Sequence, residues 1–133
     1  MKPIILIFIV FLIDQITKYL FYGKNFDLIS NVIGITSTTN TGAVFGILKG
    51  YNLILIFVAI AIILFCFKWL KEKSFNYLPL SFIIGGAFGN LIDRLIFGFV
   101  RDFLDFKIWP VFNFADAFIT IAIVLIIIKE VRK

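Results

Sequence analysis

Histidine is absent from this chain of 133 residues, and Cys66 is the only cysteine. Without histidine the chain cannot build a Ser-His hydrolase site, a His-x-x-x-His zinc protease site or the usual histidine-containing zinc sites. A lone cysteine cannot form a disulfide within the chain. Because Cys66 lies inside an apolar run, we expect a buried, unreactive thiol rather than a nucleophile.

Charge is also scarce, since only 16% of the residues are charged while 62% are hydrophobic. The mean hydropathy of +1.08 excludes an ordinary soluble domain and indicates a membrane protein. The net charge of +5 comes from basic residues that mostly flank apolar runs, which favours contact with membrane lipid over nucleic acid. The length predicts one integral-membrane domain over residues 1–133.

Four apolar runs are long enough to cross a hydrocarbon layer about 30 Å thick, which takes about 20 helical residues. They cover residues 3–22, 51–70, 78–100 and 111–128. Segment 24–50 is instead rich in β-branched residues, Asn and Gly, so we expect strands and turns there. The predicted fold is therefore an all-α membrane protein with four transmembrane helices and a small extracytoplasmic β-cradle between the first two.

The distribution of basic residues predicts the orientation of these helices. Four spans place both termini on one side, which carries seven basic residues: Lys2, Lys68, Lys71, Lys73, Lys129, Arg132 and Lys133. The opposite side carries four: Lys24, Lys49, Arg101 and Lys107. Because cytoplasmic loops are enriched in lysine and arginine, we expect both termini in the cytoplasm.

Polar residues recur at helical spacing inside the predicted membrane helices. Three groups each share one helix face: Asp14 with Lys18; Gly86, Asn90 and Arg94; and Asn113, Asp116 and Thr120. The Asp14–Lys18 pair is either a structural ion pair or part of a site, and both alternatives stay open. Gly85 and Gly89 form a stripe of small residues that predicts close helix packing. We expect the three polar faces to converge inside the bundle.

Two aspartates, Asp102 and Asp116, lie where carboxylates are costly. Helix rise places Asp102 roughly 36 Å from Leu78 and Asp116 about 7.5 Å into the last helix, so both fall near the outer boundary of the membrane. Two close carboxylates share one proton, so one can activate water while the other polarises a carbonyl. Paired acids serve ion relays equally well, so the alternative of a small proton- or ion-relay membrane protein stays open.

Other chemistries fit the sequence less well. A Ser-Lys pair would need Lys18 together with one of three serines, namely Ser30, Ser37 or Ser81, and none of these has a nucleophile-like context. The phenylalanines around the aspartates offer few further oxygen ligands, so neither a metal site nor a cofactor is expected.

Five ordered phrases resemble the motifs of the lipoprotein signal peptidase (signal peptidase II) family. These phrases are "DQITKYL" (14–20), "TTNTGAVFGIL" (38–48), "GGAFGNLIDRL" (85–95), "GFVRDFLDF" (98–106) and "FNFADAFI" (112–119). The resemblance implies an aspartic endopeptidase of the bacterial cytoplasmic membrane, with its active site toward the outer leaflet. It also implies diacylglyceryl-modified prolipoproteins as partners, whose signal peptides are cleaved just before the lipidated cysteine of the lipobox.

The same resemblance implies roles for single residues. Asp102 and Asp116 match the catalytic aspartates. The residues that match substrate-binding or site-ordering positions are Asp14, Lys18, Asn40, Gly42, Gly86, Asn90, Arg94, Asn113 and Ala115. Arg94 is expected to pair with Asp93 or to order the loop that carries Asp102, and Asp105 is expected to be a solvated loop residue. The chain length and topology suffice for a monomer.

One feature departs from the family. Asp102 and Asp116 are only 14 residues apart, which is short for a segment that often forms an extracytoplasmic helix over the site. We therefore expect that lid to be reduced, or recast as a turn around Pro110.

Overall fold

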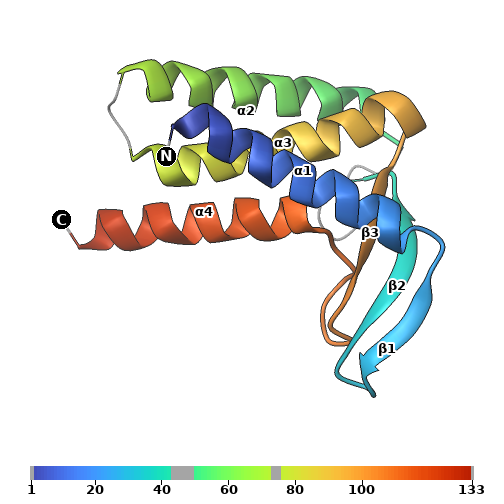
Figure 1. Cartoon of the computed structure of the whole chain (residues 1–133). Helices are drawn as coiled ribbons and strands as arrows, with labels where there is room; N and C mark the ends of the chain where they lie inside the picture. The colour runs from blue at the N-terminus through green and yellow to red at the C-terminus, as the bar shows by residue number, and fades with distance from the viewer. Residues whose placement is uncertain (1, 43–49, 73–75, 133) are drawn as a thin grey trace.

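The computed structural model describes residues 2–42, 50–72 and 76–132 of the chain (Figure 1). These residues form helices α1 (Pro3–Phe21), α2 (Asn52–Glu72), α3 (Tyr77–Phe97) and α4 (Phe114–Val131). They also form strands β1 (Asn25–Ile29), β2 (Ile33–Asn40) and β3 (Val100–Asp105). The helices run alongside one another, and the strands form a small sheet at one end of them (Figure 1).

Helix α3 is the centre of the bundle, because it packs against each of the other three helices. Its glycines allow this close approach. A Cβ atom at Gly85 would lie 2.8 Å from the carbonyl oxygen of Ile7 on α1, and one at Gly86 would lie 2.7 Å from that of Ala115 on α4. The expected stripe of Gly85 and Gly89 therefore faces α1, and Gly86 adds a second close contact toward α4.

The third predicted run, 78–100, is too long at its end, because α3 stops at Phe97. Asn76 caps the start of the helix, accepting a hydrogen bond of 3.1 Å from the Leu78 backbone N–H. Gly98 ends it with a φ of 78°, a left-handed conformation that glycine adopts without steric cost. Asp102 therefore lies on a strand, and the helix-rise estimate of its depth was wrong in its premise.

The sheet has the order β1-β2-β3, and both pairs of strands are antiparallel. Its first two strands lie between α1 and α2, as predicted for the segment 24–50. The third strand comes from beyond α3, so the expectation of a cradle built only between the first two helices was wrong. Residues 43–49, which include part of the predicted motif 38–48, lie outside the described residues.

Three helices are long and apolar enough to cross a membrane by length and composition, namely α1, α2 and α3. Many of their large apolar side chains face outward, including Phe8, Phe57 and Leu64. Helix α4 spans 18 residues and has charged residues near its two ends. The chain is thus mostly helical with a small sheet and three candidate membrane helices, while a fourth crossing by α4 stays a prediction.

Candidate active site

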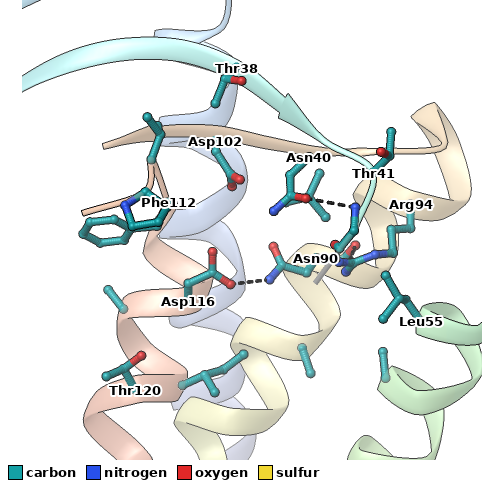
Figure 2. Close-up of a pocket in the computed structure, with 18 of the residues that line it drawn as sticks. Thr38, Asn40, Thr41, Leu55, Asn90, Arg94, Asp102, Phe112, Asp116 and Thr120 are labelled. Atoms are coloured by element: carbon teal, nitrogen blue, oxygen red, sulfur yellow. Dashed lines mark hydrogen bonds between the residues drawn. The ribbon is translucent and has the colours of Figure 1, made fainter. Parts of the chain in front are cut away.

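A cavity of about 1030 Å³ opens where the sheet meets the helices (Figure 2). Its polar end is lined by residues from β2, α3, β3 and α4: Thr38, Thr39, Asn40, Gly42, Asn90, Arg94, Asp102 and Asp116. Its apolar sides come mainly from α2 and α4, which contribute Leu55, Val58, Ile62, Ile119 and Ile121 among others. The two aspartates that the sequence singled out therefore share one cavity, together with four of the other predicted site residues.

Asp102 lies on β3, opposite Thr38 of β2, and is only 3% exposed. Its Oδ1 accepts a hydrogen bond of 2.6 Å from the Asn113 side chain. Burial, reinforced by the nearby charge of Asp116, raises the pKa of Asp102 to about 7. A carboxyl group with this pKa is partly protonated at neutral pH.

Asp116 lies in the first turn of α4, a helix start to which a carboxylate is attracted. Asn113 is the N-cap, and its Oδ1 accepts a bond of 2.9 Å from the Asp116 backbone N–H. The Asp116 side chain accepts a bond of 2.9 Å from Asn90 on α3. Figure 2 shows the carboxyl groups of Asp102 and Asp116 one above the other, with Asn40 and Asn90 beside them and a dashed line for the bond from Asn90 to Asp116.

Asn90 connects these carboxyl groups to a buried ammonium group. Its Oδ1 accepts bonds of 2.9 Å from Lys18 Nζ and of 3.2 Å from Asn113 Nδ2. Lys18 in turn pairs with Asp14 at 2.8 Å and with Asp93 at 3.5 Å, and all three of these charged side chains are 0% exposed. The Asp14–Lys18 pair is thus structural and is also linked to the site through Asn90.

The arginine that pairs with Asp93 is Arg101, not the predicted Arg94. Arg101 Nη2 lies 2.8 Å from Asp93 Oδ1, and its backbone N–H also donates to Asp93. The same Nη2 donates to Gln15 at 2.9 Å, and Gln15 donates to both Asp14 and Asp93. Neither Gln15 nor this role of Arg101 was predicted, because the chain leaves the helix at Gly98 and helical spacing no longer relates position 93 to 101.

Arg94 instead connects α3 to the residues that follow β2. Its Nη2 donates 3.0 Å to the carbonyl oxygen of Gly42, and its Nη1 donates 3.5 Å to that of Asn90. The Asn40 side chain accepts 2.9 Å from the Gly42 backbone N–H, which closes a turn at the cavity wall. These bonds match neither expected role of Arg94, which was to pair with Asp93 or to order the loop that carries Asp102; Arg94 instead holds the residues that follow β2.

Gly86 and Ala115 lie behind the cavity, where α3 meets the start of α4. The Ala115 backbone N–H donates 2.9 Å to Asp14 Oδ1, which ties α4 to α1 beside the catalytic candidate. A Cβ atom at Gly89 would collide with the Asp14 carboxylate, so this glycine makes room for a charged group. The predicted site residues thus divide into a cavity wall and a buried support behind it.

Asp105 is not the freely solvated loop residue that was expected. It ends β3, and its side chain, 14% exposed, accepts bonds from Thr36 and Lys107. The hydrogen bond from Thr36, followed by those from Lys107, holds the pKa of Asp105 below its usual value. It is absent from the cavity lining, in keeping with its exclusion from the catalytic candidates.

The segment between the two aspartates is short and contains no helix over residues 106–113, all of which the structure describes. Phe112 pairs with Leu104 in an isolated bridge, so the chain turns back on itself at once. Trp109, Pro110 and Val111 line the cavity beside this bridge. The chain thus bends at residues 107–109, just before Pro110, and carries no helical lid in this segment, while a gating role of the turn stays a prediction.

The described residues contain no group of three or more Asp, Glu or Cys side chains placed to hold a metal ion. The cavity contains the carboxyl groups of Asp102 on β3 and Asp116 on α4, and the pKa of Asp102 is raised to about 7. Such a pair can divide the roles of proton donor and base, as the two aspartates of aspartic proteases do.

Comparisons with known proteins identify the family. The sequence model of the family described as Signal peptidase (SPase) II matches residues 6–132. Lipoprotein signal peptidase of Halothermothrix orenii is 42% identical, with 93% of this chain and 91% of that protein covered. The proteins of the same name from Caldicellulosiruptor bescii and Staphylococcus aureus are 41% and 38% identical, over 95% and 97% of this chain and 90% and 86% of theirs.

Solved structures agree with this similarity. Two structures, both described as a bacterial membrane enzyme, superpose with TM-scores of 0.91 and 0.86, each at 34% sequence identity. They cover 98% and 96% of this chain, and 87% and 91% of their own chains. The chain belongs to the signal peptidase II family, a family of proteases. This membership favours the protease over the ion relay that the aspartates alone left open.

Proposed function

We propose that the protein is a single-domain aspartic endopeptidase of the bacterial cytoplasmic membrane. It removes signal peptides from diacylglyceryl-modified prolipoproteins and cleaves before the lipidated cysteine. Asp102 and Asp116 are its catalytic pair. The observation that carries this proposal is the meeting of these two carboxyl groups in one cavity, in a chain of the signal peptidase II family.

The environments of the two aspartates support different roles. Asp102, with its pKa of about 7, is partly protonated at neutral pH, and its protonated form can donate the proton to the scissile carbonyl oxygen. Asp116 lies at the start of α4, where its side chain accepts a hydrogen bond from Asn90 and its backbone N–H donates to the Asn113 cap, and it serves as the ionised base. Asp116 takes a proton from water as the water oxygen attacks the carbonyl carbon, and later gives it to the departing amine.

The shape of the cavity supports a lipid-bearing substrate. Its apolar sides on α2 and α4, with residues such as Val58 and Ile121, suit acyl chains, while its polar end suits a peptide backbone. Asn40, Gly42 and Arg94 stand at that polar end, where they can order an extended segment. A substrate held in the outer leaflet by its acyl chains then presents its scissile bond at the level of the aspartates. A monomer suffices for this arrangement, because one chain supplies both carboxyl groups.

Substitution of either aspartate tests the assignment. Asp102→Asn or Asp116→Asn should each reduce cleavage of a lipid-modified prolipoprotein by about 1000-fold or more, since an amide cannot exchange the proton that the pair shares. The double substitution should cost little more than either single one, because the two groups act as a unit. The measurement is the mobility shift of processed prolipoprotein on a gel, with thermal melting of each variant.

Asp105→Asn is the matched control, since Asp105 carries the same change on β3 but lies outside the cavity. It should retain most of the activity. Full cleavage by a well-folded Asp102→Asn or Asp116→Asn variant would end the assignment.

A further inference from the structure

Two asparagine side chains lie between the buried Lys18 and the two aspartates, and the orientation of both amides is determined by their partners. Asn113 Oδ1 faces the backbone N–H of Asp116, which can only donate. The Asn113 Nδ2 hydrogens are therefore directed to Asp102 Oδ1 at 2.6 Å and to Asn90 Oδ1 at 3.2 Å. An amide nitrogen carries two hydrogens, so both are used.

The Asn90 amide is fixed in the same way from the opposite side. An ammonium group has three donors and no acceptor, so Lys18 Nζ, 2.9 Å away, requires an oxygen at this end of Asn90. The donation from Asn113 requires the same oxygen. Asn90 Nδ2 must then face Asp116 Oδ1, at 2.9 Å. A reversed amide would set N–H groups against N–H groups and leave a buried ammonium donor unsatisfied.

This chain of donors has a consequence for the proton that the aspartates share. An N–H bond to one oxygen of a carboxyl group favours negative charge on that oxygen, so the proton is held more readily by the other oxygen. Asp102 Oδ1 and Asp116 Oδ1 both accept from amides, so the shared proton is left to the second oxygen of each carboxyl group. With Asn90 reversed, its carbonyl oxygen would instead accept from a proton on Asp116 Oδ1 and so hold that proton away from the reaction.

We propose that Lys18 is a positioning residue that acts through Asn90: by fixing the orientation of this amide, it keeps the shared proton off the Oδ1 atoms of the catalytic carboxyl groups. The inference rests on the proposed function and specifies how its site is ordered. Lys18 itself is 0% exposed and absent from the cavity lining, so it acts without contact with substrate.

Several charged and polar groups surround Lys18, so its substitution changes the local charge as well as one hydrogen bond. They are Asp14 on α1, Asn90 and Asp93 on α3, Arg101 and Asp102 on β3, and Asn113 and Asp116 on α4. Loss of Lys18 alone would remove a positive charge near the aspartates as well as a donor to Asn90. The test must therefore separate the field of the ammonium group from its hydrogen bond.

A charge-balanced variant achieves this separation. Asp14→Asn keeps an oxygen for the Ala115 N–H and leaves Lys18 in place. Asp14→Asn combined with Lys18→Met removes one positive and one negative charge and takes away the donor to Asn90. Without Lys18, only the hydrogen bond from Asn113 still orients the Asn90 amide, so a larger share of the molecules holds it reversed. The reversed amide favours a proton on Asp116 Oδ1, so in those molecules the base is available only at higher pH. In the pH profile of kcat/KM, the acidic limb of the combined variant should lie about one pH unit higher than that of Asp14→Asn. Its kcat should be about 100-fold lower than that of Asp14→Asn.

Asn90→Asp tests the same inference with Lys18 intact. The new carboxyl group can still accept from Lys18 but has no N–H for Asp116, so a proton is held between the two carboxyl groups. We expect the acidic limb to move to higher pH here also. Lys68→Met, at an exposed lysine on α2, is the matched control and should leave both limbs unchanged.

Infrared titration of the protonated carboxyl groups gives a second measurement that does not depend on catalysis. The midpoint pH of this titration should rise in the combined variant and in Asn90→Asp, but not in Asp14→Asn or Lys68→Met. Unchanged limbs and midpoints in folded variants would overturn the role of Lys18. Absence of cleavage by the unmodified protein would instead overturn the proposed function, and the infrared midpoints would still decide the orientation of the amide.

Discussion

At the scale of single residues, the two aspartates differ because different elements hold them. Asp102 is on a strand, buried to 3% exposure, and its neighbour Asp116 adds a like charge. Asp116 starts a helix, where backbone N–H groups favour a negative charge. These different surroundings support the proposed roles of Asp102 as the acid and Asp116 as the base.

The pH dependence of cleavage follows from this difference. The pKa of Asp102 is raised to about 7, so its proton is present below that pH and lost above it. When both carboxyl groups are ionised, no acid remains to polarise the scissile carbonyl. We expect kcat/KM to fall about tenfold per pH unit above roughly pH 7, measured with a lipid-modified prolipoprotein in detergent. A profile that stays flat to pH 9 would contradict the role of Asp102 as the acid.

At the scale of secondary-structure elements, α3 positions the proposed catalytic group at the start of α4. Gly86 brings α3 against the backbone of Ala115, directly before Asp116. Asn90, one turn further along α3, then reaches the Asp116 carboxylate at 2.9 Å. The close packing of α3 against α4 and the geometry of the site therefore both depend on Gly86.

Gly86→Ala tests this dependence. The added Cβ would lie 2.7 Å from the Ala115 carbonyl oxygen, which belongs to the backbone and yields only if α4 moves. We expect a loss of about 1–3 kcal/mol in stability together with at least a tenfold loss of cleavage. Both are measurable by thermal melting and gel-shift processing.

Gly23→Ala is the control for that substitution. No atom lies within 4 Å of its added Cβ, and its φ of 76° makes the alanine strained by about 1 kcal/mol. Cleavage should stay near the unmodified level despite the lower melting temperature. An active Gly86→Ala variant would show that α4 is not positioned by this contact.

At the scale of the whole molecule, the helices define two ends. Both termini lie at the end away from the sheet (Figure 1). The cavity opens at the other end, where β2 and β3 meet α3 and α4. If the helices cross the membrane, the termini share one side, and the aspartates lie near the other.

Labelling of single cysteines tests which end of the helix bundle faces the cytoplasm and which faces the outside. In a Cys66→Ala background, Leu28→Cys places a thiol on the exposed edge strand β1, and Lys2→Cys places one beside the N-terminus. A membrane-impermeant maleimide should label position 28 in intact cells and position 2 only after permeabilisation. The reverse pattern would put the aspartates on the cytoplasmic face and would contradict the proposed location.

The sequence by itself determined the parts of this protein that depend on local patterns. Apolar runs of about 20 residues can only be buried or in lipid, so all four helices were predicted to within a few residues. Spacing of four residues placed Asp14 with Lys18 and Asn90 with Arg94 on shared faces, because a helix has a fixed period. The motif pattern identified the family and both aspartates.

Only the tertiary structure decided which distant residues are partners. Arg101 pairs with Asp93, and β3 completes the sheet, because Gly98 reverses the chain after α3. No helical or strand period extends across such a turn, so spacing could not reveal either contact. The connection from Lys18 through Asn90 to Asp116 likewise joins three helices, and hydrogen bonds between elements depend on packing that a linear pattern does not encode.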